Sequence, residues 1–203
     1  MDSATISNLA LDLLGEDPIS SIDEDQESAR LCKRHLVQIA YELQREFPWK
    51  QFIKRAQLSS DTTAPEWGYT TRYLLPSGCL KLIDVYVNEY KLDRWTVESG
   101  YVLCNVADGP LQIRYIEENL DYNNWDMLYV SAVYHRLAQR ICMAITSSPS
   151  KKQELDLAFR EVMQKARHAS ALEGIAAPVN EPSGLEIARM NGLHNSDFYG
   201  WYS

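Results

Sequence analysis

The sequence lacks the short motifs by which most enzyme and cofactor sites are recognised. It contains no Gly-rich phosphate-binding motif of the GxGxxG or GxxxxGKS/T type and no GxSxG nucleophile turn. It also has no CxxC pair, since its four cysteines, Cys32, Cys79, Cys104 and Cys142, are widely spaced. We therefore expect no zinc ribbon and no bound cofactor, and we expect the cysteines to be free, mostly buried thiols.

Long apolar segments are absent too. No run approaches the roughly 18 apolar residues that a membrane helix needs. The chain opens with the acidic and polar Met1-Asp2-Ser3, where a signal peptide would be basic and then apolar. The composition, 45% hydrophobic and 24% charged, is ordinary for a soluble globular protein. These features predict a cytosolic protein with no membrane partner.

Positive charge is scarce, and the net charge is −8. A protein that grips nucleic acid normally shows a basic stripe, because its affinity comes largely from neutralised phosphates. No such stripe is visible in the sequence. The acidic balance suits a protein that stays soluble at high concentration, or one that must not adhere to DNA passing nearby.

Acidic side chains are densest in residues 14–30, LGEDPISSIDEDQESAR. A calcium loop starting at Asp23 would need Gly and Glu at the positions that Ser28 and Arg34 occupy. Cys32 and His35 could share a helix face, but the sequence offers no second pair of ligands. We therefore predict no metal site and interpret the stretch as a seam between two helices.

In that interpretation Gly15 ends the first helix and Pro18 keeps the turn extended. Ser21 and Glu24 have the spacing of a capping box for the second helix. Residues 23–25 then fall in its first turn, where the helix dipole favours negative charge. What stays open is whether the surplus acidic side chains face water, the lysines of the last helix or a neighbouring subunit. These side chains are Glu16, Asp17 and Glu27.

Four amphipathic helices are predicted from apolar residues spaced three and four apart. They cover residues 3–14, 22–46, 123–146 and 148–174. Asp2 or Ser3 can cap the first helix, and Pro48 stops the second. The fourth begins with Ser148 as its N-cap and Pro149 at its first position.

Between residues 50 and 118 the pattern changes to short runs rich in Val, Ile, Tyr and Trp. Predicted strands cover residues 52–58, 72–76, 80–90, 94–97, 101–106 and 111–118. Within 80–90 the alternation places one set of side chains, Ile83, Val85 and Val87, opposite another, Leu82, Asp84 and Tyr86. Tight turns are expected at 98–100 and 107–110.

The last 29 residues, 175–203, combine Pro, Gly and Asn with apolar and aromatic side chains. The prolines and glycines argue against a long helix, whereas disordered linkers are poor in aromatic residues. We expect an arm that docks on another chain, with folding back onto its own domain as the alternative. The candidate docking residues are Pro178, Pro182, Leu185, Ile187, Arg189, Phe198, Trp201 and Tyr202.

The predicted fold class is α+β. Two helices precede the β region and two follow it, and a lone helical hairpin cannot bury both of its apolar stripes. We therefore predict a four-helix bundle formed by residues 1–49 and 119–174. An antiparallel β domain is inserted at 50–118, and an extended C-terminal arm follows at 175–203.

Several short motifs, taken in order, resemble the tail tubular protein A family, the head-to-tail adaptors of short-tailed bacteriophages. They are Leu14-Gly15-Glu16 with Pro18-Ile19, Ser28-Ala29-Arg30, Phe47-Pro48-Trp49, YLLPSGCLKLIDV at 73–85, Lys165-Ala166-Arg167 and EPSGLEIAR at 181–189. The resemblance covers nearly the whole chain and rests on the order of the motifs. The arm departs from the family at Gly184-Leu185, where relatives have Trp-Leu, and Trp201 is the candidate to replace that Trp.

The resemblance implies a structural virion protein and not an enzyme. It implies a homo-oligomeric ring, a dodecamer, docked to the portal protein above and to the tail nozzle, tail tubular protein B, below. DNA would pass through the lumen without specific binding. The protein would belong to the virion tail and to the host cytoplasm during assembly. The arm is then the candidate contact with portal or a neighbouring subunit, and turns of the β region carry the candidate nozzle-facing residues Asn88, Tyr90, Lys91, Arg94 and Asp108.

Two other functions stay open. A virion-associated glycan hydrolase carried on the adaptor would need two carboxylates roughly 5–10 Å apart. Its candidates are Glu117 and Glu118, at the end of a predicted strand. A regulator that binds DNA through the helix at 22–46 would use its basic side chains, Arg30, Lys33, Arg34 and Arg45. The competing interpretation of those four is a solvated or subunit-facing surface.

Overall fold

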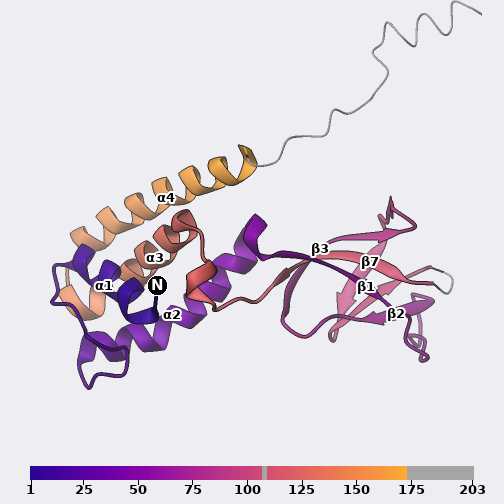
Figure 1. The fold of residues 1–203 in the computed structure, drawn as a ribbon, viewed down its shortest axis with the longest axis horizontal. Helices are drawn as coiled ribbons and strands as arrows, with labels where there is room; N and C mark the ends of the chain where they lie inside the picture. Colours follow the sequence, from indigo (N-terminus) through magenta and orange to yellow (C-terminus); the bar gives the residue numbers. More distant parts are fainter. Residues whose placement is uncertain (107–108, 173–203) are drawn as a thin grey trace, which may run out of the picture. The chain divides into compact units, whose positions relative to one another are not determined.

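The computed structural model describes residues 1–106 and 109–172, and over them the chain is a mixed α+β protein with four α-helices and antiparallel sheets (Figure 1). The helices are α1 (Ser3–Leu14), α2 (Glu27–Glu46), α3 (Met127–Thr146) and α4 (Pro149–Leu172). The strands are β1 (Ile53–Leu58), β2 (Thr71–Leu74), β3 (Cys79–Val87), β4 (Tyr90–Lys91), β5 (Trp95–Glu98), β6 (Tyr101–Cys104) and β7 (Leu111–Glu117). Short 3-10 helices, η1 (Lys50–Phe52) and η2 (Tyr122–Asn124), flank them. The described strands all follow α2 and precede α3, as the change of hydrophobic period predicts.

Helix α1 ends at a glycine, as predicted. Asp2 caps its start by accepting a hydrogen bond from the Thr5 backbone N–H at 2.8 Å. Gly15 adopts the left-handed conformation, with φ at 75°, and its N–H bonds to the Asp12 carbonyl at 3.2 Å. No atom lies within 4 Å of the place where a Cβ on Gly15 would stand, so the cost of a side chain there is conformational and not steric crowding.

We expect Gly15→Ala to lower the free energy of unfolding by about 1 kcal/mol, because Ala resists the left-handed conformation that Gly adopts freely. The matched change is Ser147→Gly at the end of α3, where a non-glycine residue already has φ at 50°. That change should act in the opposite direction. Urea denaturation followed by circular dichroism measures both, and an unchanged midpoint for Gly15→Ala would contradict the prediction.

Helix α2 begins at Glu27, later than the predicted start at residue 22. Glu24 does accept a hydrogen bond from the Ser21 N–H, at 3.1 Å, as in a capping box. It also accepts one from the Ser20 N–H at 2.8 Å, while the Ser21 hydroxyl accepts from the Asp23 N–H at 3.2 Å. Side chains that satisfy the backbone this locally hold a turn and compete with helix formation. The predicted helical turn at 22–26 is therefore wrong, and only Glu27 of the acidic run lies in the first turn of α2.

The predicted start is wrong for α3 and confirmed for α4. Helix α3 begins at Met127, after η2, because Asp126 caps it by accepting a hydrogen bond from the Leu128 N–H at 2.8 Å. The predicted start at 123 is therefore wrong. Helix α4 begins as predicted, with the Ser148 hydroxyl accepting from the Lys151 N–H at 3.3 Å and Pro149 at its first position.

The helices share one apolar core. Helices α1 and α2 both contact α3, and each of the three contributes side chains that are almost completely buried, such as Leu11, Leu36 and Leu137. Helix α4 adds buried side chains of its own to this core, Leu155, Met163 and Ala166. Apolar side chains of all four helices are thus removed from water, which is the main favourable term in folding.

The described strands form two antiparallel sheets, of order β1-β7-β3-β4 and β2-β6-β5. Both sheets contribute to a second apolar core, in which Tyr73, Val85 and Val102 are fully buried. The predicted turn at 98–100 is confirmed, since β5 and β6 are joined through Ser99 and Gly100, both with positive φ.

Strand β3 differs from the strand predicted at 80–90 in two ways. It ends at Val87, and Asn88 and Glu89, both with positive φ, form a two-residue turn to β4. A register shift between Leu82 and Asp84 also inserts an extra residue. Leu82 and Val85 therefore both face the core, and Asp84 and Tyr86 point to the other face. The predicted alternation therefore holds from Asp84 to Val87 but is wrong at Leu82, which the β-bulge places on the same side as Val85.

Aromatic side chains cluster where the chain passes between the helices and the strands. Trp49 and Phe52 precede β1, and Trp125 precedes α3. The Tyr129 ring, on α3, meets all three edge-on, with ring centroids 5.1, 4.8 and 4.9 Å away. The Tyr129 hydroxyl donates to the Ala40 carbonyl at 2.7 Å, and burial raises the pKa of this phenol far above its usual value.

The last turn of α2 is also hydrogen-bonded to the β region. Gln44 is fully buried, and its amide donates to the Asn119 carbonyl at 2.7 Å and accepts from the Asn119 N–H at 3.1 Å. Its neighbour Arg45 donates to the Leu80 carbonyl in β3. Helix α2 is thus fixed at its C-terminal end both to β3 and to the segment that follows β7. Residues Met1–Ser170 form one compact unit.

The predicted arm at 175–203, with all of its candidate docking residues, lies outside the described residues, and so does Asp108. Within the described part of the chain, no helix is long and apolar enough to cross a membrane.

Candidate functional site

The sheet β1-β7-β3-β4 has a polar face, which points away from the apolar core of the β region. Antiparallel register brings two rows of side chains together on it. We call the six members the polar sheet face: Gln57, Gln112 and Tyr86 in one row, and Arg55, Arg114 and Asp84 in the next. Their neighbours along the strands, such as Ala56, Val85 and Ile113, pack in the core because successive side chains in a strand point to opposite faces.

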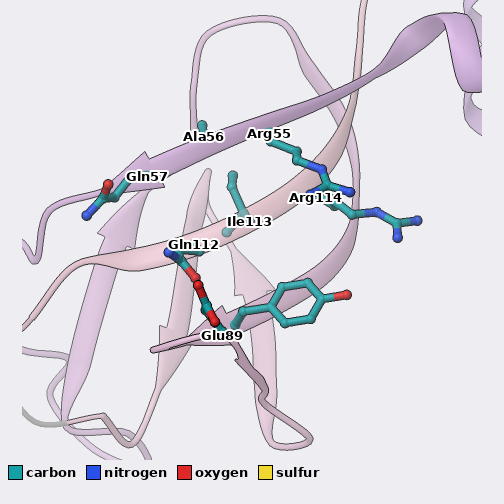
Figure 2. A pocket seen from close by; sticks show the side chains of 8 residues that line it. Arg55, Ala56, Gln57, Glu89, Gln112, Ile113 and Arg114 are labelled. Atoms are coloured by element: carbon teal, nitrogen blue, oxygen red, sulfur yellow. The ribbon is translucent and has the colours of Figure 1, made fainter. Parts of the chain in front are cut away.

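A hollow of about 520 Å³ opens on this face. Figure 2 shows the Arg55 and Arg114 side chains extending in the same direction from neighbouring strands, β1 and β7. Gln112 and Ile113 lie farther along β7, and Glu89 lines the hollow from the turn between β3 and β4. The hollow is thus bordered mainly by polar side chains from three strands and one turn.

The charges on this face are unequally paired. Asp84 is only 8% exposed and lies 2.8 Å from the Lys91 ammonium and 3.4 Å from Arg114 Nε. Its carboxylate raises the pKa of Lys91 by hydrogen bonding. Arg114 Nε is itself buried and lacks a geometrically sound hydrogen bond within the described chain. Arg114 is therefore held at its buried Nε by the ion pair with Asp84, while its terminal nitrogens make no hydrogen bond to any described residue.

Arg55 lies directly opposite Arg114 in the register. It is exposed, and within the described part of the chain its guanidinium makes no ion pair or hydrogen bond. Like charges directly opposite each other in a sheet destabilise it. An anion placed between the two guanidinium groups would remove that repulsion.

The remaining members of the polar sheet face are suited to hydrogen bonding. The side chains of Gln57, Gln112 and Tyr86 make no hydrogen bond among the residues that the structure describes. A guanidinium presents its donors as a planar fork that matches a carboxylate. Chemically, this arrangement can bind an acidic side chain of another molecule and surround it with amide and phenol groups.

Three of the candidate nozzle-facing residues lie near this face. Asn88 lies in the turn between β3 and β4, and Tyr90, the first residue of β4, is 81% exposed. Lys91 is bound to Asp84 and so helps to hold β4 against β3. Arg94 is exposed in the connection from β4 to β5. The structure thus brings Asn88, Tyr90 and Lys91 together and leaves Arg94 in the next loop.

Glu117 and Glu118 are not arranged as a facing pair of carboxylates. Consecutive residues along an extended strand point to opposite sides. Glu117 lies 3.8 Å from the Lys54 ammonium. Glu118 instead lies beside Tyr41 of α2, whose pKa is raised by burial and, to a lesser extent, by Glu118. This geometry gives no support to glycan hydrolysis at these two residues.

The basic side chains of α2 are largely engaged within the chain. Arg30 pairs with Asp25 and Lys33 pairs with Asp23, both at 2.8 Å. Arg45 donates to a backbone carbonyl of β3. Carboxylates therefore neutralise much of the local positive charge that a DNA-binding helix would need.

The acidic stretch at 14–30 is a fixed turn. Both polar atoms of the Asn8 amide bond to the Ile19 backbone at 2.9 Å, and the Ile19 side chain is buried. Lys151 of α4 pairs with Glu154 of its own helix at 3.3 Å. The surplus acidic side chains, Glu16, Asp17 and Glu27, are exposed and make no ion pair with any described residue. We call these three the acidic seam.

Cys32 and His35 both lie on α2. Burial raises the pKa of the Cys32 thiol, and burial together with Arg140 and Arg34 lowers the pKa of His35. Over residues 1–106 and 109–172, no group of three or more His, Cys, Asp or Glu side chains could hold a metal ion. The four thiols are free, with Cys79 partly exposed and the others buried, as predicted.

Sequence reasoning missed the polar sheet face. The alternation of IKRAQL and LQIRYIE does mark Arg55, Gln57, Gln112 and Arg114 as facing away from the core. What the sequence cannot supply is that β1 pairs with β7, which places Arg55 against Arg114.

No protein-family model matches the chain, and a search of the curated proteins finds no significant match. The family resemblance therefore depends on the order of the sequence motifs alone.

Proposed function

We propose that the chain is a structural head-to-tail adaptor of a short-tailed bacteriophage, which forms a ring between the portal and the tail nozzle. The main support for this proposal is the position of the family-like motifs in the fold. Leu14-Gly15 ends α1, and Phe47-Pro48-Trp49 lies where α2 ends and the β region begins. YLLPSGCLKLIDV spans the end of β2 and most of β3. Motifs at element junctions shape a fold, so their shared order supports a shared architecture.

The proposal includes a four-helix bundle as the body of the subunit. Contacts of α4 with its neighbours support it. Arg167 on α4 bonds to Glu46 on α2 at 2.6 Å. The Arg136 guanidinium on α3 lies 5.3 Å from the centre of the Phe159 ring on α4. In this arrangement both helical hairpins bury their apolar stripes against each other.

DNA transit without binding is part of the same proposal. The net charge is −8, and ion pairs with Asp23 and Asp25 neutralise basic side chains of α2. A negatively charged channel wall repels phosphates and lets DNA slide. The partners are therefore proteins, namely portal, nozzle and neighbouring copies, and the subunit needs no cofactor or catalytic residue.

The test is electron microscopy of the purified chain mixed with the portal protein of the same virus. We expect rings of the chain on one end of the portal, and class averages give the symmetry. A chain truncated after residue 179 should stay folded and soluble but no longer join the portal, since we assign the arm at 175–203 to that contact. Portal particles that carry no added ring with the full chain would contradict the proposed function. Normal assembly of the truncated chain would contradict only the role of the arm.

A further inference from the structure

We propose that the polar sheet face of one copy binds the acidic seam of the next copy, and that this contact joins neighbouring subunits. The inference rests on the proposed ring, and it names the two surfaces that meet. Arg55 and Arg114 on the sheet would each receive a carboxylate from Glu16, Asp17 or Glu27 of the neighbour.

The two surfaces complement each other in charge. The sheet presents two guanidinium groups from directly opposed positions, one of them without any partner among the described residues. The seam presents three exposed carboxylates that are likewise unpaired within the described chain, although nearby Asp23 and Asp25 are paired. Arg55 therefore lacks the carboxylate that the seam supplies, and an inserted carboxylate would relieve the repulsion between the two arginines.

The two surfaces of one chain are held apart by α2. The seam lies at the N-terminal end of this helix, whereas its last turn, at Gln44 and Arg45, is bonded to the β region. A helix of 20 residues is roughly 30 Å long. The counterpart of each surface is therefore in another copy. A contact between two different surfaces of identical copies is a heterologous contact. Such contacts close into a ring when the rotation from one copy to the next fits.

The backbone beneath the seam and the Arg114 side chain are ordered before the two surfaces meet. The seam is anchored by the bonds of Asn8 to Ile19 and of Glu24 to two backbone N–H groups. On the sheet, Arg114 is positioned by its ion pair with Asp84. Groups that are already ordered lose less entropy on association, so more of the charge attraction remains as affinity.

The experiment is a charge exchange between two copies. One variant carries Arg55→Glu, and the other carries Glu16→Arg with Asp17→Arg. Each variant alone should self-associate about tenfold or more weakly than the unaltered chain. An equal mixture should recover the unaltered association to within about twofold, because an alternating assembly again pairs opposite charges at every contact. Sedimentation velocity at low salt measures the association, and raising the salt should weaken it.

Arg94→Glu is the matched control, because Arg94 is exposed in the same β region but lies off the polar sheet face. It should associate as the unaltered chain does. The inference is overturned if Arg55→Glu associates normally, if mixing restores nothing, or if the unaltered chain associates neither in solution nor on the portal.

The same variants, imaged on the portal, separate this inference from the proposed function. Normal rings with Arg55→Glu would overturn the contact and leave the adaptor function standing. Charge-exchangeable association in solution, with no ring on the portal, would support the contact and overturn the adaptor function.

Discussion

Replacing Trp49 by Ala is expected to lower the free energy of unfolding by about 3–5 kcal/mol, the usual cost of removing a large buried aromatic side chain. Trp49 is 3% exposed, and its indole N–H donates to the Leu43 carbonyl at 2.9 Å. Its ring meets Phe47 and Tyr129 edge-on, with centroids 5.2 and 5.1 Å away. The change removes all of these contacts at the passage from α2 to the β region.

Urea denaturation followed by circular dichroism measures this loss. The matched control is Trp67→Ala, because Trp67 is 86% exposed and should change stability by no more than about 0.5 kcal/mol. Since small domains are stable by only about 5–15 kcal/mol, the Trp49 variant should be marginal at physiological temperature. Equal midpoints for the two variants would show that the aromatic cluster contributes little to the stability of the fold.

Replacing Gln44 by Ala is expected to cost about 2–4 kcal/mol. The change removes the hydrogen-bond partner of the Asn119 N–H and leaves the Asn119 carbonyl only the bond from the Trp125 indole N–H at 3.3 Å. An unsatisfied buried group costs about 1–3 kcal/mol, and the loss of the buried Gln44 side chain adds to it. Gln44 itself is fully buried, with bonds of 2.7 and 3.1 Å to Asn119. The loss should also loosen the segment that connects β7 to α3.

Hydrogen exchange locates this second effect. Amides around Asn119 should exchange faster in Gln44→Ala, while amides in the centre of the sheet β1-β7-β3-β4 keep their protection until the chain unfolds globally. The control is Gln38→Ala, on the exposed side of the same helix, where the amide bonds only to Glu42 at 3.0 Å. Ala is a better helix former than Gln, so Gln38→Ala should not destabilise the helix. A loss of stability as large for Gln38→Ala would mean that the bonds to Asn119 do not explain the result.

Prediction from the sequence succeeded where a single physical cause determines the local structure. Apolar spacing located the four helices, and Gly15 marked the end of α1 because a left-handed residue at a helix end is usually glycine. It failed where side chains competed for the same backbone groups. Ser21 and Glu24 have capping-box spacing, yet they hold a turn, and α2 starts only at Glu27.

The candidate site was harder to predict for a different reason. The polar sheet face depends on which strands pair and on a bulge between Leu82 and Asp84, and both are set by contacts distant in sequence. A single residue more or less in β3 would exchange the faces of Asp84 and Val85. The acidic seam, by contrast, was visible as surplus charge, and what the structure adds is that its carboxylates remain unpaired within the described chain.

The bonds between Gln44 and Asn119 also bear on how such a chain can evolve. They bring the entry and exit of the β region within one side chain of each other, and the first register pair beyond them is Ile53 with Ile116. A change of length within 53–117 should therefore leave the points at which the chain leaves α2 and returns toward α3 where they are, provided that Gln44 and Asn119 are kept.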